Sequence, residues 1–139
     1  MAQTITFVPR PGSQSLSAPA LQPQFTQAIP LSLYVHIPWC VRKCPYCDFN
    51  SHNAPEQLPE NALVDALLKD LTAALPGIWG RRVETVFFGG GTPSLLSPAA
   101  IDQLLTGFRT LLPLSPQAEI TLEANPGTVD AQRFSAFRD

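Results

Sequence analysis

From residue 31 to the end of the chain, short apolar segments alternate with longer segments of helical periodicity. In residues 31–36, apolar and polar residues alternate, so a strand here places Tyr34 and His36 on the face opposite the leucines. Residues 83–88 and 118–123 are the other two predicted strands, and both contain β-branched and apolar residues. The hydrophobic pattern therefore predicts three short strands.

Helical segments follow these strands. A helix over residues 59–75 begins at a proline and has an apolar stripe, with Gly77 as its expected stop. Ser97 is expected to cap a second helix that has Pro98 at its first position, and Thr128 to cap a third. The residues expected to face the sheet are Leu63, Val64, Leu67, Leu68, Leu71 and Leu75 in the first helix, and Ile101, Leu104, Leu105, Phe108, Leu111 and Leu112 in the second.

The repeated strand–helix order predicts an α/β fold with a parallel sheet and right-handed crossovers. The third strand would leave an unpaired edge, so we expect the chain to be the first part of a longer protein. Residues 1–30 are rich in Ser, Gln, Pro and Ala, and Arg10 is their only charged residue. We expect residues 1–30 to be a disordered leader and residues 31–139 to be a truncated core domain.

Composition and charge exclude several classes of function. Of the 139 residues, 45% are hydrophobic and 14% charged, and no apolar run is long enough to span a bilayer. The net charge of −2 provides no basic surface for nucleic acid. Three closely spaced cysteines cannot all pair, which favours a reducing compartment and a metal site over a disulfide framework.

The three cysteines, Cys40, Cys44 and Cys47, have the spacing C-x3-C-x2-C. Three thiolates are one short of the four that complete the coordination of a cubane iron–sulfur cluster, so one iron would stay open to another ligand. A zinc site with His36 or His52 as the fourth ligand is the alternative. Zinc ribbons usually have two separated cysteine pairs, whereas all three cysteines here share one loop, which favours the cluster.

Two further motifs end predicted strands. Three glycines precede Thr92 and Pro93, and they permit either close approach of a ligand or a tight turn; their number favours a ligand. Glu123 ends the third strand on the face opposite its apolar residues, where parallel α/β folds bind ligands. It is equally compatible with a solvated strand end. Tyr34 is a candidate ligand contact, while His36 is expected to be a satisfied interior histidine.

The loop that carries the cysteines is also rich in aromatic and basic residues. Trp39, Tyr46 and Phe49 are expected to crowd the cysteines and exclude water, which would tune a cluster's potential. Arg42 and Lys43 are expected to be solvated loop charges.

Taken together, these motifs resemble the radical S-adenosylmethionine (SAM) superfamily, whose signature is C-x3-C-x-aromatic-C. Within it, Tyr34-Val-His-Ile-Pro-Trp-Cys40, Gly-Gly-Gly-Thr-Pro-Ser and Glu-Ala-Asn-Pro-Gly-Thr are similar to the oxygen-independent coproporphyrinogen III oxidase family, especially its heme-chaperone branch. The resemblance covers residues 31–139. It implies the N-terminal half of a (β/α)6 partial barrel, with parallel strands and outer helices.

The resemblance also implies cofactors and the residues that hold them. Cys40, Cys44 and Cys47 would bind three irons of a [4Fe-4S] cluster, and SAM would chelate the fourth. The residues that the resemblance assigns to SAM are Tyr34, Tyr46, Phe49, Gly90, Gly91, Thr92 and Glu123.

Phe49 distinguishes two branches of the family. The oxidases typically have a fourth cysteine two residues after the third, where this chain has Phe49. This implies a cytoplasmic heme chaperone, whose partners are heme or porphyrin, a heme-accepting protein and a one-electron donor, with membrane contact only through the recipient. The alternatives are the oxidase itself, which decarboxylates a porphyrinogen, and a zinc-stabilised binding module without catalysis. Whether the chain is an enzyme stays open, and we expect SAM cleavage by these 139 residues alone to be weak or absent.

Overall fold

The computed structural model describes residues 29–78, 80–127 and 131–138. It contains a three-stranded parallel sheet in the order β1 (Leu31–Ile37), β4 (Val83–Gly90) and β5 (Leu114–Leu122). This confirms the predicted α/β fold and its parallel strands. The expected leader falls outside the described residues except for its last two positions, and the expected cap at Thr128 also lies outside them.

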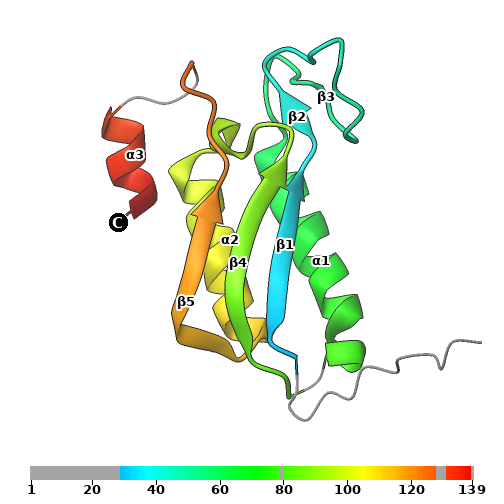
Figure 1. Cartoon of the computed structure of the whole chain (residues 1–139), viewed down its shortest axis with the longest axis vertical. Helices are drawn as coiled ribbons and strands as arrows, with labels where there is room; N and C mark the ends of the chain where they lie inside the picture. Colours follow the sequence, from blue (N-terminus) through cyan, green and yellow to red (C-terminus); the bar gives the residue numbers. More distant parts are fainter. Residues whose placement is uncertain (1–28, 79, 128–130, 139) are drawn as a thin grey trace, which may run out of the picture.

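The helices α1 (Glu60–Ile78) and α2 (Pro98–Leu111) cover one face of the sheet (Figure 1). A short 3-10 helix, η1 (Pro93–Leu95), precedes α2, and α3 (Ala131–Arg138) follows β5. The predicted cap of α2 is confirmed, because the Ser97 side chain accepts a hydrogen bond from the backbone N–H of Ala100 at 3.2 Å.

The predicted stop of α1 at Gly77 is wrong, because the helix continues through Pro76 and Gly77 to Ile78. Pro76 lies in the last turn, where its missing N–H removes only one backbone hydrogen bond. Leu75 and Ile78 both pack against the core, and this burial favours the additional turn.

The core lies between the sheet and the two long helices. The predicted helix faces are confirmed: Val64 and Leu71 of α1 are buried, and their neighbours on the apolar stripe pack around them. The Phe88 and Phe108 rings lie 6.2 Å apart between β4 and α2. The buried hydrophobic residues are Val35, Ile37, Val64, Leu71, Val83, Val86, Phe88, Leu96, Ala100, Ile101, Leu104, Phe108 and Leu112.

Glu60 joins the N-terminal ends of the two long helices. Its carboxylate accepts hydrogen bonds from the backbone N–H of Ser97 at 2.6 Å and from the Ser97 hydroxyl at 2.7 Å. Both helix ends carry partial positive charge, which favours an acidic side chain between them. This contact fixes the start of α2, and therefore also the loop that joins β4 to it.

Candidate functional site

The carboxyl ends of β1, β4 and β5 meet at one edge of the sheet, and three loops rise from that edge (Figure 1). The segment that follows β1, residues 38–53, carries the three cysteines and is called the cysteine loop. It contains two short paired strands, β2 (Trp39–Cys40) and β3 (His52–Asn53). Gly91 and Thr92, which follow β4 and are called the glycine loop, lead into η1, and a turn through Asn125 follows β5. Ligands of parallel α/β folds bind at this edge.

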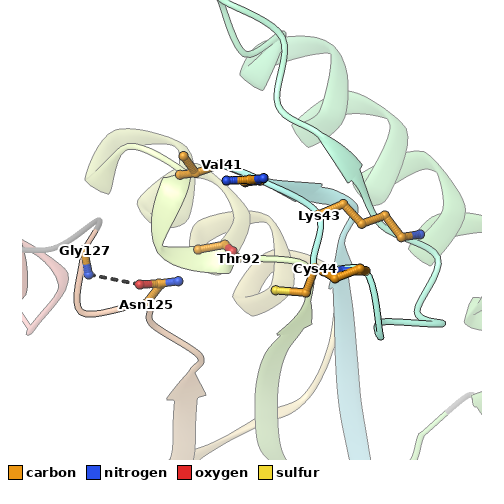
Figure 2. Close-up of a pocket in the computed structure, with 8 residues that line it drawn as sticks. Val41, Lys43, Cys44, Thr92, Asn125 and Gly127 are labelled. Carbon is orange, nitrogen blue, oxygen red and sulfur yellow. Dashed lines mark hydrogen bonds between the residues drawn. The ribbon is translucent and has the colours of Figure 1, made fainter.

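These loops surround a cavity of about 540 Å³. Figure 2 shows the Cys44 sulfur on the side of this cavity where Asn125 and Gly127 lie, while Lys43 points away. A second cavity of about 400 Å³ contains Glu123 and shares Thr92 and Asn125 with the first. The residues that line the larger cavity are Val41, Arg42, Lys43, Cys44, Pro45, Thr92, Asn125 and Gly127.

Asn125 lines both cavities but is not among the site residues predicted from the sequence, where it appears only within the Glu-Ala-Asn-Pro-Gly-Thr motif. Its side chain accepts a hydrogen bond from the backbone N–H of Gly127 at 3.0 Å, which shapes the loop over the cavity. The signal that selected Glu123, its position at the end of a parallel strand, applies equally to Asn125 two residues later.

The cysteines form a set of three free thiols within one loop. Cys44 is exposed, Cys40 and Cys47 are partly buried, and the backbone N–H of Cys47 bonds to the Cys44 carbonyl at 3.1 Å. Within residues 29–78, 80–127 and 131–138, no three His, Cys, Asp or Glu residues are grouped so that they could hold one metal ion. A cubane binds each thiolate through a different iron, so its ligands need not converge on one point. The absence of a single-ion site among the described residues therefore does not count against a cluster, and three thiolates are the chemical type of ligand that such a cluster binds.

Lys43 links the first part of the cysteine loop to residues 49–53 at its end. Its ammonium donates hydrogen bonds to the carbonyls of Ser51 at 2.9 Å and Phe49 at 3.2 Å, and its backbone N–H donates to the Asn53 side chain at 2.8 Å. Lys43 is exposed, as predicted for a solvated loop charge, but that prediction missed the hydrogen bonds by which it holds the loop. Nothing in the local sequence reveals this role, because the partners lie six to ten residues away and depend on how the loop folds.

Tyr34, His36 and Phe87 lie on the face of the sheet that α1 and α2 leave open. The Tyr34 hydroxyl lies 3.0 Å from Nδ1 of His36, and Nε2 of His36 lies 2.8 Å from the Asn50 carbonyl. A carbonyl only accepts, so Nε2 carries the proton and, in the neutral ring, Nδ1 accepts from the tyrosine. The predicted satisfaction of His36 is confirmed, whereas its predicted interior position is not, because the residue is only partly buried. A zinc bond to His36 would have to break one of these contacts.

The Tyr34 ring stacks on Phe87, with centroids 6.2 Å apart, and 56% of the tyrosine is exposed. The prediction that Tyr34 lies on the non-helix face is confirmed. His36 links the tyrosine hydroxyl to the Asn50 carbonyl of the cysteine loop.

Two aromatic residues of the cysteine loop are largely exposed, Tyr46 by 87% and Phe49 by 63%, and Trp39 is partly buried. The expectation that these rings exclude water from the cysteines is wrong for Tyr46 and Phe49, because the loop extends beyond the end of the sheet and leaves both rings in solvent (Figure 1), although Tyr46 does contact Cys44. A side-chain hydrogen bond with Cys44, together with the charge of that thiolate, raises the pKa of Tyr46.

Because Gly90 and Gly91 have no side chains, the end of β4 packs closely against β1 and against Trp39, which follows β1. A Cβ on Gly90 would lie 2.7 Å from the His36 ring, and one on Gly91 would lie 2.5 Å from the Trp39 carbonyl oxygen. The N–H groups of Gly91 and Thr92 already donate to the carbonyls of Ile37 and Trp39, both at 2.7 Å. Packing therefore accounts for Gly90 and Gly91 without a ligand, and Thr92 is the residue of this loop that lines both cavities.

Comparison with known proteins agrees with this arrangement. Residues 34–139 match the radical SAM superfamily. The chain is 60% identical to the heme chaperone HemW of Escherichia coli over 109 residues, which are 78% of this chain and 29% of that protein. It is 51% identical over 112 residues to the HemW of Haemophilus influenzae, with the same two coverages.

A solved structure, that of the radical SAM enzyme coproporphyrinogen III oxidase (HemN) from Escherichia coli, is similar with a TM-score of 0.71 and 34% identity. The match covers 78% of this chain and 25% of that one. The chain thus spans less than a third of the length of the curated relatives named above. None of the helices among the described residues is long and apolar enough to cross a membrane. The chain belongs to the radical SAM superfamily, in the HemN-like group that includes the HemW heme chaperones.

Proposed function

We propose that this chain is the cofactor-binding part of a radical SAM heme chaperone. Cys40, Cys44 and Cys47 hold a [4Fe-4S] cluster, and SAM occupies the cavity beside Cys44. The observation that carries this proposal is the position of the Cys44 thiol, which lines a cavity of about 540 Å³ together with Thr92 and Asn125, at the carboxyl ends of parallel strands. Membership of the superfamily implies both cofactors.

The cluster and SAM together supply one-electron reductive cleavage of a carbon–sulfur bond when both are bound. The chain's residues bind and orient. Thr92 and Glu123 line the smaller cavity, and their hydroxyl and carboxylate are the polar groups proposed for the amino-acid end of SAM. Because the N–H groups of Gly91 and Thr92 already have partners, the glycine loop meets SAM through carbonyl oxygens and the Thr92 side chain.

Three aromatic residues complete the proposed SAM site. Tyr34 lies on the open face of the sheet, where its ring is half exposed and its hydroxyl is held by His36. Tyr46 and Phe49 extend from the cysteine loop and are the apolar surface available to cover an adenine. A cofactor bound against these exposed rings would itself cover them and lose water from that side.

The chaperone is favoured over the oxidase by Phe49. This residue lies two positions after the third cysteine, where a fourth thiol would add a further donor. The relatives at 60% and 51% identity are heme chaperones by name, whereas the solved neighbour at 34% is an oxidase. The proposed partners are heme, a heme-accepting protein and a one-electron donor in the cytoplasm, with membrane contact only through the recipient.

Anaerobic reconstitution with iron and sulfide tests the cluster. We expect a brown product with about four irons and four sulfides per chain. The Cys44→Ala variant removes the ligand that lines the cavity and is expected to lose most of this iron. A colourless product that retains zinc would instead identify the structural zinc alternative.

Heme titration tests the branch, with full-length HemW of Escherichia coli as a positive control. A longer protein that contains this chain should bind heme and leave coproporphyrinogen unchanged. Decarboxylation of coproporphyrinogen would assign the protein to the oxidases and overturn the chaperone proposal.

A further inference from the structure

Ser51 is an unusual residue of the cysteine loop because it is almost completely buried. Only 1% of its surface is exposed, whereas most of residues 41–50 are exposed. A buried hydroxyl needs a hydrogen-bond partner, because an unsatisfied polar group away from water is destabilising. The partner of the Ser51 hydroxyl therefore indicates what this burial achieves.

Within the described part of the chain, the Ser51 hydroxyl has one hydrogen-bond partner, the Cys47 sulfur at 3.9 Å. The backbone of Ser51 is fixed on both sides. Its N–H donates to the Phe49 carbonyl at 2.7 Å, and its carbonyl accepts from the Lys43 ammonium at 2.9 Å. The hydroxyl is thus held in place beside a cysteine rather than free to turn to solvent.

We propose that Ser51 is a positioning residue that donates a hydrogen bond to the Cys47 thiolate and raises the reduction potential of the cluster. This inference rests on the proposed [4Fe-4S] cluster. A thiolate bound to iron has no proton, so the serine hydroxyl must be the donor. Hydrogen bonds to an ionised acceptor are shorter and stronger than those to a neutral one, so ligation of Cys47 shortens the 3.9 Å contact.

The direction of the effect follows from charge. Reduction adds one electron to the cluster and its thiolates, and a donated hydrogen bond stabilises the more negative state more strongly. Because Ser51 is buried, water cannot replace the lost donor in a variant without the hydroxyl. Removing it should make the cluster harder to reduce, which slows electron delivery to SAM.

The test is a redox titration of the reconstituted chain, followed by electron paramagnetic resonance. Two matched pairs isolate the hydroxyl: wild type against Ser51→Ala, and Ser51→Thr against Ser51→Val, in which only the hydroxyl differs. We expect a more negative midpoint potential in Ser51→Ala than in wild type, and in Ser51→Val than in Ser51→Thr. Iron and sulfide per chain, measured in parallel, should stay at wild-type values.

Ser94→Ala is the control, because Ser94 is also fully buried and its hydroxyl accepts a hydrogen bond from the backbone N–H of Asn125 at 3.3 Å. Its potential should equal that of wild type. Equal potentials within both Ser51 pairs would overturn the inference. A loss of cluster confined to the two variants without the hydroxyl would also overturn it, because Ser51 would then act in cluster assembly. A wild-type chain that takes up no iron would instead refute the proposed function.

Discussion

The tight contact between the glycine loop and the continuation of β1 makes Gly91→Ala a sensitive test of the structure. The Cβ of an alanine at this position would lie 2.5 Å from the Trp39 carbonyl oxygen and 2.8 Å from the Trp39 carbonyl carbon. Both atoms belong to backbone rather than to a flexible side chain. The substitution must therefore separate β4 from the start of the cysteine loop.

The expected cost follows from the hydrogen bonds at this contact. The Gly91 N–H donates to the Ile37 carbonyl and the Thr92 N–H donates to the Trp39 carbonyl, both at 2.7 Å. Each such bond contributes about 0.5–1.5 kcal/mol, so weakening both costs about 1–3 kcal/mol. The lower entropy of the unfolded alanine variant returns about 0.4–1 kcal/mol. We expect a net loss of about 1–2 kcal/mol in the free energy of unfolding.

Urea denaturation followed by circular dichroism measures this change. Gly77→Ala is the matched control, because no heavy atom lies within 4 Å of its added Cβ and the residue sits in the last turn of α1. Alanine favours helix there, so the control should gain up to about 1 kcal/mol. Equal stabilities of the two variants would refute the close packing described for Gly91.

Two further predictions concern contacts that hold the loops. Glu60→Ala removes both hydrogen bonds to Ser97 and should lower the free energy of unfolding by about 2 kcal/mol in thermal or urea denaturation, while the exposed Glu84→Ala should change it by less than about 0.5 kcal/mol. A Glu60→Ala variant as stable as Glu84→Ala would contradict the link between α1 and α2. Lys43→Met removes the donor to two loop carbonyls and should speed amide hydrogen exchange in the cysteine loop. Arg42 makes no hydrogen bond in the described part of the chain, so Arg42→Met should leave this exchange unchanged. Unchanged exchange in Lys43→Met would show that the lysine does not hold the loop.

The sheet and its helices were predictable because their signals are local. Alternation of side chains identified β1, and the Ser97-Pro98 pair identified the start of α2. The end of α1 was not predictable, because burial of Ile78 outweighs the local preference of Pro76 and Gly77 to stop a helix.

The candidate site divides in the same way. The cysteines follow from their spacing, and Glu123 follows from its place at a strand end. The roles of Lys43 and Ser51 depend on how the cysteine loop folds back on itself, and no periodic pattern encodes that path. The glycines were attributed to a ligand, whereas the structure shows that packing against Trp39 and His36 already requires them. The assignment of Gly90 and Gly91 to SAM therefore stays a prediction.

The central claim is that three cysteines leave one iron of a cluster open for SAM. Mössbauer spectroscopy of the chain, reconstituted with the Mössbauer-active isotope of iron and measured with and without SAM, tests it most directly. We predict that one iron of the four separates from the other three when SAM is added, because its coordination changes while the three cysteine-bound irons keep theirs. A cluster whose four irons stay equivalent in the presence of SAM would contradict the account.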